Sequence, residues 1–387
     1  MNVPKLRFKE FTDEWKNIKL QKIISIYKEQ STIENQYPML TSSKQGLVLQ
    51  KDYYSNNARI TNRSNIGYNV LPYGYITYRN RSDTGFFTFN INLKLKKGLI
   101  SYFYPVFSLK NSNEYFLVNL LNTKYQFKMY AISEGTSQKV LSIANLKNLK
   151  VLYPSLEEQN KIANFLTTVD KKITNLENTI TSLENQKKGL LQQIFSQKLR
   201  FKDKNGNNYP NWEKKKLEDI SNITMGQSPD SDFVNTEKIG TPFLQGNAEF
   251  TNKYPIEKYW CTKPQKIANP TDILLSVRAP VGAINIANKK FCIGRGLSAI
   301  SFNCNKLFGK YNLEFNLFQL IKKSQGSTFS SINKKDISEV ILFIPCLEEQ
   351  TKIADFLSAF DRKLENQKAQ LEHWQQIKKG LLQQMFV

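Results

Sequence analysis

Residues 156–193, LEEQNKIANFLTTVDKKITNLENTITSLENQKKGLLQQ, decide the fold because the chain contains this stretch twice. The second copy, LEEQTKIADFLSAFDRKLENQKAQLEHWQQIKKGLLQQ, occupies residues 347–384, which is 191 positions later and without a gap. The two copies are identical at 19 of 38 positions. A repeat of this length, kept in register, indicates an internal duplication.

Apolar residues in both copies recur at alternating spacings of four and three, the heptad pattern of a coiled coil. We predict two long helices, each about 40 residues or roughly 60 Å long at 1.5 Å per residue. Because both copies lie in one chain, we expect them to pair antiparallel within the molecule. The predicted helix–helix seam consists of Ile162, Leu166, Val169, Ile173, Leu176, Ile180, Leu183, Leu190, Ile353, Leu357, Phe360, Leu364, Leu371, Trp374 and Leu381.

The start of the first copy carries a capping signal. Ser155 stands before the apolar run and Glu158 follows three residues later, which is the capping-box pattern. The second copy has Cys346 at the cap position, so we expect it to keep the acidic residues and lose the hydroxyl.

A shorter repeat links the two ends of the chain. The tetrapeptide KLRF occurs at residues 5–8 and again at residues 198–201, and a tryptophan follows each, Trp15 and Trp212. The second KLRF comes directly after the first long repeat, so the N-terminus matches what would follow the C-terminal residue. The duplication is therefore circular, and we expect the two termini to lie near each other.

The segments between the repeats combine short β-type runs with predicted helices over residues 114–129 and 313–323. We predict an α+β fold: two mixed α/β domains separated by two long antiparallel coiled-coil helices, in a pseudo-two-fold circular arrangement. The predicted boundaries are 1–153 for the first domain, 154–197 for the central helix, 198–344 for the second domain and 345–387 for the C-terminal helix.

The charge of the chain is strongly basic and unevenly placed. The 387 residues include 55 Lys and Arg against 33 Asp and Glu, a net charge of +22. Residues 1–150 carry 22 basic against 9 acidic residues and residues 198–343 carry 22 against 13, whereas both repeat segments are neutral. A basic excess confined to the two domains indicates a polyanionic partner, and we predict nucleic acid.

Cysteine and histidine usage argues against several kinds of site. The four cysteines form no CxxC pair, which indicates buried thiols in a reducing compartment. The only histidine is His373, so neither a zinc site nor a histidine-based catalytic dyad is expected. No run of 18 apolar residues occurs, and we expect a soluble, cytoplasmic protein that does not bind a membrane.

Motifs of catalysis are also missing from the sequence. It contains neither the NPPY or DPPY tetrapeptide of adenine methyltransferases nor a GxxxxGK(S/T) phosphate loop. Glu14, and Asp203 with Glu213, resemble part of a metal-nuclease pattern, but a lysine-rich chain produces this match by chance. The sequence favours binding without catalysis. A standalone metal-dependent nuclease and a structural coiled-coil protein are the alternatives.

Arg, Lys, Asn and Gln are the residues that contact base edges and phosphates, and both domains contain clusters of them. Aromatic members of such clusters are more often core residues than stacking platforms. The DNA-binding candidates of the first domain are Arg59, Asn62, Arg63, Tyr73, Tyr78, Arg79, Asn80 and Arg81. Those of the second domain are Gln227, Ser228, Gln245, Asn247, Lys263, Gln265, Lys266, Arg278 and Arg295.

Taken together, these residues resemble the specificity (S) subunit of type I restriction–modification enzymes over the whole chain. The matching motifs are LEEQxKIAxFL and KKGLLQQ at the ends of each long repeat, DILLSVRAPVG at residues 272–282 and GSTF at residues 326–329. The first domain departs from this pattern, since residues 78–81, YRNR, replace the VRAP form.

The resemblance implies a function and a set of partners. Each domain would be a target-recognition domain that reads one half of a bipartite, asymmetric site in double-stranded DNA, while the paired helices fix the spacer and recruit partners. Two adenine-methyltransferase subunits and two restriction subunits would bind this chain. S-adenosylmethionine, ATP and Mg²⁺ would act in those partners, and the chain itself would hold no cofactor and perform no chemistry.

Overall fold

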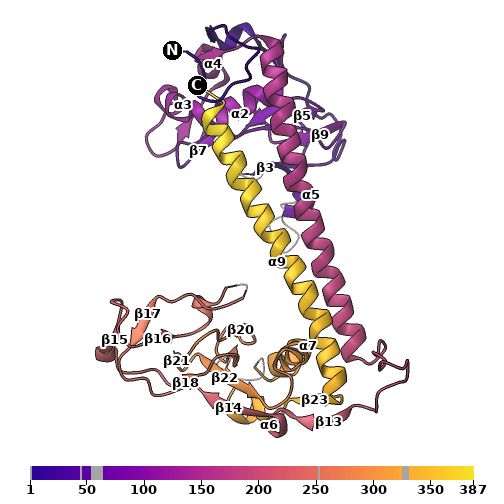
Figure 1. The fold of residues 1–387 in the computed structure, drawn as a ribbon. Helices are drawn as coiled ribbons and strands as arrows, with labels where there is room; N and C mark the ends of the chain where they lie inside the picture. The colour runs from indigo at the N-terminus through magenta and orange to yellow at the C-terminus, as the bar shows by residue number, and fades with distance from the viewer. Residues whose placement is uncertain (1, 44–45, 54–63, 252, 325–330) are drawn as a thin grey trace. The chain divides into compact units, whose positions relative to one another are not determined.

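The computed structural model describes residues 2–43, 46–53, 64–251, 253–324 and 331–387. The chain divides into two compact units, Met1–Glu177 with Ala369–Val387 (unit 1) and Asn178–Lys368 (unit 2). Each unit contains a mixed α/β domain and part of each of two long helices, α5 (Leu156–Phe195) and α9 (Leu347–Gln384) (Figure 1). The predicted α+β fold with two repeated domains and two long helices is confirmed.

Unit 1 is built around a four-stranded antiparallel sheet in the order β2-β10-β6-β8. Its strands are β1 (Lys16–Lys19), β2 (Ile24–Tyr27), β3 (Leu40–Ser43), β4 (Gly46–Leu49), β5 (Asn69–Pro72), β6 (Ile76–Tyr78), β7 (Arg81–Ser82), β8 (Phe89–Ile91), β9 (Lys97–Ile100), β10 (Val106–Leu109), β11 (Lys139–Val140) and β12 (Lys150–Tyr153). Outside the sheet, β1 pairs with β12, β3 with β4, β5 with β9 and β7 with β11.

The short helices of unit 1 are η1 (Leu20–Lys22), α1 (Gln50–Tyr53), α2 (Glu114–Lys124), α3 (Gln126–Ile132) and α4 (Ile143–Asn148). Asn113 starts α2, because its side chain accepts a hydrogen bond from Phe116 N at 2.9 Å. Phe116 and its neighbours on α2 are fully buried against the sheet. The helix predicted over residues 114–129 breaks at Tyr125, whose hydroxyl accepts from Leu152 N at 2.7 Å.

Unit 2 repeats the four-stranded sheet, here in the order β14-β22-β19-β20, and adds a five-stranded sheet, β15-β17-β16-β21-β18. Its strands are β13 (Glu213–Lys216), β14 (Ser221–Met225), β15 (Val234–Asn235), β16 (Thr241–Leu244), β17 (Tyr259–Cys261), β18 (Ile267–Ala268), β19 (Ile273–Ser276), β20 (Ile284–Ile286), β21 (Phe291–Ile293), β22 (Leu297–Phe302) and β23 (Ile341–Ile344). The pair β13·β23 corresponds to β1·β12 of unit 1.

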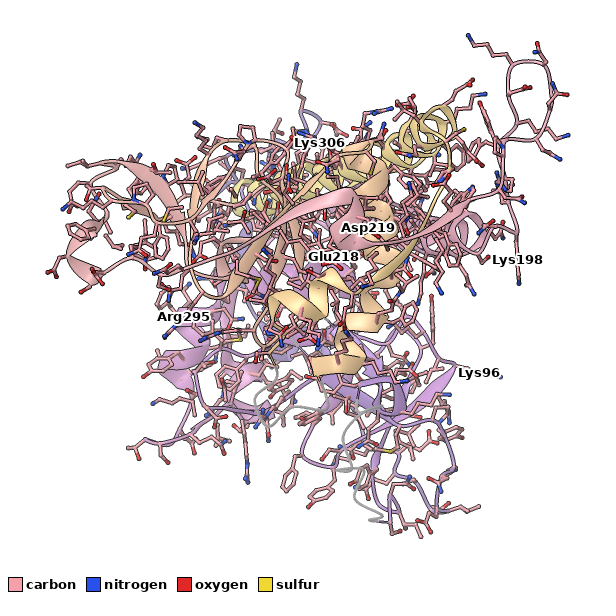
Figure 2. The ribbon with its side chains drawn as sticks, turned by 90° about the horizontal axis from the view of Figure 1, so that it is seen from below. Lys96, Lys198, Glu218, Asp219, Arg295 and Lys306 are labelled. Atoms are coloured by element: carbon pink, nitrogen blue, oxygen red, sulfur yellow. The ribbon has the colours of Figure 1, made fainter. Side chains whose placement is uncertain are left out.

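The short helices of unit 2 are α6 (Leu217–Ile220), η2 (Ser231–Phe233), η3 (Asn247–Glu249), α7 (Lys306–Ser324) and α8 (Lys334–Ser338). Glu218 and Asp219 follow one another on α6 (Figure 2), and Asp219 accepts a hydrogen bond from Lys216 N at 2.9 Å. Helix α7 begins seven residues before the helix predicted from residue 313, because Asn305 caps it by accepting from Phe308 N at 3.1 Å.

A buried glutamate at the start of each long helix holds an arginine and a tryptophan. In unit 1, Arg7 donates from Nε and Nη2 to Glu158 at 2.7 and 2.8 Å, and Trp15 Nε1 donates to the same carboxylate at 3.2 Å. Glu158 is 2% exposed. We call this three-residue arrangement the Arg–Glu–Trp clamp. It joins the N-terminal KLRF segment to the start of α5.

Unit 2 contains the same clamp, formed by Arg200, Trp212 and Glu349. Arg200 donates two hydrogen bonds to Glu349 at 2.8 Å each, and Trp212 Nε1 donates a third at 3.0 Å. Glu349 is fully buried. In both units the glutamate's hydrogen bond holds the pKa of its arginine above the usual value. The second KLRF segment is therefore tied to the start of α9.

The two chain ends meet in unit 1 as the circular duplication predicts (Figure 1). Leu6 N donates to Gln384 O at 3.0 Å, and this contact is equivalent to Leu199 N donating to Gln193 O at 3.0 Å in unit 2. Aromatic packing at the helix ends is equivalent as well. Phe386 packs on Phe116 in unit 1, as Phe195 packs on Phe308 in unit 2.

The long helices α5 and α9 lie side by side and run antiparallel in each unit (Figure 1). In unit 2, Glu184 pairs with Lys368 at 2.6 Å and Lys187 with Asp361 at 2.5 Å, so that partner numbers fall along α9 as they rise along α5. In unit 1, Asp170 pairs with Lys378 at 2.6 Å. Lys187 lies between Leu183 and Leu190, where the heptad pattern would place an apolar residue, and Lys378 is its equivalent on α9. Each has a carboxylate partner on the facing helix.

All predicted seam positions are buried or half-buried. The buried ones are Ile162, Leu166, Val169, Leu176, Ile180, Leu183, Ile353, Leu357 and Leu364, and the half-buried ones are Ile173, Leu190, Phe360, Leu371, Trp374 and Leu381. Ile162 and Leu166 also belong to the core of unit 1, and Ile353 and Leu357 belong to that of unit 2. The first turns of each helix are therefore part of a domain core, which the heptad pattern did not predict.

The cap at Ser155 is confirmed, since its hydroxyl accepts a hydrogen bond from Glu158 N at 3.3 Å. The reciprocal half of the capping box does not form, because the Glu158 carboxylate accepts from Arg7 and Trp15 instead. The prediction of buried thiols is right for Cys261 and Cys292, where burial raises the pKa of Cys292 to about 12. It is wrong for Cys346, which is exposed at the start of α9.

Glu158→Ala should lower the free energy of unfolding by about 3 kcal/mol, because Arg7 and the Trp15 ring nitrogen lose a buried acceptor. Urea denaturation measures this change. The matched control is Glu157→Ala, one position earlier on the same turn and exposed, which should change stability by less than about 0.5 kcal/mol. Equal effects of the two substitutions would show that the clamp does not stabilise the fold.

Candidate nucleic-acid interface

In unit 2, the loops that follow three strands meet at one place. Gln227 comes after β14, Gln245 after β16 and Arg295 after β21. Gln227 N donates to Ile293 O at 2.9 Å, and Gly294 N donates to Leu244 O at 2.8 Å. We call loops 226–228, 245–247 and 294–296 together the polar junction. Residues far apart in sequence are brought together there by backbone hydrogen bonds.

Glycines make this close approach of three backbones achievable. A Cβ at Gly226 would lie 2.2 Å from Gly294 O, and a Cβ at Gly296 would lie 2.7 Å from Gln245 O. Neither space accommodates a side chain. The side chains that the junction presents are therefore those of the residues next to the glycines.

The polar junction places four predicted DNA-binding residues together. Gln227, Gln245 and Arg295 are exposed, Ser228 is half-buried, and Ser228 Oγ accepts from Arg295 N at 3.2 Å. The Arg295 side chain extends away from the ribbon (Figure 2). Arg278 adjoins them, because the preceding residue, Val277, donates from N to Gly296 O at 2.9 Å.

A cavity of about 680 Å³ opens beside the junction, lined in part by Ser228, Gln245 and Arg295. Asn235, Glu237 and Tyr259 also line it, and sequence reasoning missed all three. Their proximity depends on the pairing of β15 with β17, which no local pattern in the sequence predicts. With arginine donors, amide groups and a carboxylate, the wall of the cavity matches the hydrogen-bonding groups of base edges.

The remaining candidates of unit 2 lie at the surface outside this cluster. Lys263, Gln265 and Lys266 are exposed, and the ammonium group of Lys263 lies 4.3 Å from the centroid of the Phe233 ring. Asn247 is half-buried at the start of η3. These residues are not part of the lining of the cavity beside the polar junction.

In unit 1, Arg79 and Arg81 are exposed and Asn80 is half-buried between them. The Arg81 guanidinium lies 5.0 Å from the centroid of the Phe103 ring. Arg79 follows β6 as Arg278 follows β19, and these two strands occupy equivalent positions in the two four-stranded sheets. Tyr73 is 60% exposed. Arg59, Asn62, Arg63 and the GSTF motif lie outside the described residues.

The prediction that Tyr78 contacts DNA is wrong. Its side chain is fully buried, stacked on Phe89, and its hydroxyl donates to Leu141 O at 2.9 Å. Burial raises the pKa of this hydroxyl, so it remains protonated as a donor. A ring held inside the core cannot reach DNA without unfolding of the domain.

The acidic residues that resembled a nuclease pattern have structural partners or lie at the surface. Asp203 accepts from the backbone N of Asn205 and Asn207 at 2.8 Å each, and these hydrogen bonds hold its pKa below the usual value. Glu213 pairs with Lys215 at 2.9 Å. Glu14 is exposed. Within the described residues, no group of three or more His, Cys, Asp and Glu is arranged to bind a metal ion.

Across the parts of the chain that the structure describes, no helix combines the length and the apolar character that a membrane span requires.

Comparison with known proteins gives consistent matches. A family model described as the type I restriction modification DNA specificity domain matches residues 12–185 and 209–373. A protein of Methanocaldococcus jannaschii, assigned as the specificity subunit of the type I restriction enzyme MjaX, is 38% identical over 287 residues, which are 70% of this chain and 67% of the relative. The MjaIX specificity subunit of the same organism is 24% identical over 348 residues, covering 84% and 75%.

Two solved structures share the fold. The S subunit of a type I restriction–modification system from M. genitalium superposes with a TM-score of 0.65 at 16% identity, covering 100% of this chain and 99% of that one. A chain from work on complex assembly and conformational transition of the type I R-M system superposes with a TM-score of 0.57 at 24% identity, covering 95% and 96%.

Gly226→Ala should destabilise the protein by about 1–3 kcal/mol, because the added methyl group overlaps Gly294 O. The same substitution at Gly189, inside α5 with no atom within 4 Å of the added Cβ, should stabilise it by about 0.5–1 kcal/mol. Thermal unfolding of the two variants should give midpoints that move in opposite directions. A Gly226→Ala midpoint at or above that of the wild type would contradict the tight packing of the junction.

Proposed function

Since the chain belongs to the type I restriction modification DNA specificity family, we propose that it is the DNA sequence-recognition subunit of a type I restriction–modification complex. The observation that carries this proposal is the polar junction. Gln227, Gln245 and Arg295 stand together there, on strand ends fixed by backbone hydrogen bonds. Arginine matches the O6 and N7 atoms of guanine, and glutamine matches the N6 and N7 atoms of adenine.

Each domain would read one half of a bipartite, asymmetric site. The two units share the four-stranded sheet and the Arg–Glu–Trp clamp, but their exposed polar residues differ. Unit 1 presents Arg79 and Arg81, whereas unit 2 presents Gln227, Gln245 and Arg295. Two domains with the same fold but different exposed polar residues fit the recognition of two different half-sites.

The paired helices would fix the number of unread base pairs between the half-sites. Helix α5 has 40 residues and α9 has 38. Polar pairs inside the seam, Lys187 with Asp361 and Lys378 with Asp170, oppose a shift of one helix along the other, since a shift would leave partly buried charges unpaired. A fixed helix register suits a fixed spacer length.

The chain would act without chemistry of its own, in the cytoplasm, as the subunit that recruits two methyltransferase and two restriction subunits. S-adenosylmethionine, ATP and Mg²⁺ would act in those partners. Support comes from the family and from the acidic residues, because Asp203 and Glu213 are engaged in a turn and an ion pair. No observation favours the nuclease alternative.

Gln245→Ala and Arg295→Ala should relax recognition of one half-site, with a loss of about 1–3 kcal/mol in discrimination at the affected base pair, or roughly 5- to 150-fold. Methylome sequencing of a host carrying the complete system measures the recognised motif. Arg79→Ala is the control in unit 1 and should alter only the other half-site. The proposed function fails if removing the chain leaves every bipartite methylation motif in place.

Adding one heptad to both long helices, after Thr181 in α5 and after Glu372 in α9, should lengthen the spacer. Seven residues add about 10 Å, which corresponds to about three base pairs at 3.4 Å each. Both half-site sequences should stay unchanged in the methylome. A changed half-site with an unchanged spacer would contradict the assignment of the helices.

A further inference from the structure

Unit 1 has a patch of exposed aromatic side chains on α3 and the loop before β8. Phe127 is 86% exposed, Phe86 62% and Tyr130 49%. The loop is fixed to the helix, because Phe87 N donates to Gln126 Oε1 at 2.9 Å and Gln126 Nε2 donates to Phe87 O at 2.8 Å. A Cβ at Gly85 would lie 2.4 Å from the Tyr130 ring. These aromatic groups are therefore exposed on a well-fixed surface.

Unit 2 has an equivalent patch on α7. Phe318 and Ile321, 191 positions after Phe127 and Tyr130, are 61% and 40% exposed. The equivalent loop again reaches the helix through a glycine, since a Cβ at Gly282 would lie 3.7 Å from Ile321 Cγ1. We call the patches around Phe127 and Phe318 the paired apolar patches.

The opposite face of these helices is equivalent too. Met129 on α3 and Leu320 on α7, also 191 positions apart, are both fully buried. Helix α7 is tied to β23, because Gln319 exchanges two hydrogen bonds of 3.0 Å with the backbone of Ile341. The two helices thus present the same face outward, and each places a phenylalanine there.

Large apolar groups exposed together on a fixed surface are typical of protein contact sites. The two domains have diverged in the polar residues assigned to DNA, so a surface common to both does not fit two different half-sites. A surface common to both domains fits one kind of protein, with one copy bound to each domain. The partner is therefore a protein present in two copies, rather than DNA.

The position of the patches indicates which protein this is. Arg79 and Arg278, the arginines after the equivalent strands, begin the two loops that lead to Gly85 and Gly282. A methyltransferase has to reach an adenine inside the half-site that the domain reads, so it has to touch the domain close to its reading residues. A restriction subunit that acts elsewhere on the DNA is under no such requirement.

The basic residues around each patch indicate the charge that the partner's contact surface should carry. The Lys139 ammonium lies 4.8 Å from the Tyr130 ring centroid and that of Lys128 lies 4.9 Å from the Tyr125 ring centroid. In unit 2, Lys322 follows Ile321 on α7 and is exposed. The surface that fits is an apolar pocket with an acidic rim.

Resting on the proposed function, we propose that the paired apolar patches bind the methyltransferase subunits, one at Phe127 and one at Phe318. Each phenylalanine inserts into an apolar pocket of its methyltransferase. The contact holds the enzyme next to the half-site that the same domain reads.

The test uses the full chain with the methyltransferase subunit of its own system, mixed as purified proteins. Light scattering after size exclusion gives the mass of the complex, and titration calorimetry gives the affinity. Wild type should bind two methyltransferase subunits. Phe127→Ser and Phe318→Ser should each weaken one of the two sites at least tenfold, and the double variant should weaken both. Ile33→Ser, exposed in unit 1 outside the patch, is the matched control and should bind as wild type does.

Methylation gives a second measurement on the same variants. Phe127→Ser should lower methylation of one half-site and Phe318→Ser that of the other, while circular dichroism shows both variants folded. A double variant that binds two methyltransferase subunits with wild-type affinity overturns the inference. The inference is also overturned if a variant still binds both methyltransferase subunits but no longer binds DNA. It is likewise overturned if a variant abolishes self-association of the chain. If the wild type binds no methyltransferase, the proposed function fails, and the inference falls with it.

Discussion

The Arg–Glu–Trp clamp is the interaction on which the rest of the structure depends. Glu158 and Glu349 are buried carboxylates, and each accepts hydrogen bonds from an arginine guanidinium and an indole. A buried carboxylate without such partners is strongly unfavourable, so the KLRF segment cannot leave the helix start without a large loss of stability. Each clamp joins the segment that lies at the end of one long helix to the beginning of the other. The domain is thereby held against both helices at once.

A second pair of polar contacts sits further along the helices and ties them to the domains. Asp361 accepts from Tyr311 of α7 at 2.7 Å and pairs with Lys187 of α5. Asp170, 191 positions earlier, bonds Tyr115 of α2 and pairs with Lys378. Burial, together with the hydrogen bond to Asp361, raises the pKa of the Tyr311 hydroxyl, so it stays a donor. Three elements in each unit therefore meet at one carboxylate, which opposes both sliding of the helices and rotation of the domain.

Much of the fold could be predicted because the duplication is visible in the sequence. The two helices, their antiparallel pairing and the circular closure follow from residues 156–193, residues 347–384 and KLRF. What could not be predicted depends on contacts between distant positions. Ser155 could be predicted as a helix cap from the local sequence. The partner of the Glu158 side chain could not, because it is Arg7, 151 residues away. Similarly, Arg295 and Gln245 could be predicted as polar loop residues. Their proximity could not be predicted, because it depends on glycines where two backbone segments approach closely. Tyr78 was a DNA-binding candidate because it stands in a cluster with Arg79 and Arg81, but β6 is buried on both faces and its ring lies in the core.

The hydrogen bond from Leu6 to Gln384 reproduces, without a covalent link, what the polypeptide itself provides between Gln193 and Leu199. The two joints therefore share the same backbone contact, and each half of the duplication consists of a domain and its helix. Exchange of one domain and its helix between related genes would replace one half-site of the recognised DNA sequence in a single step and leave the other half-site unchanged.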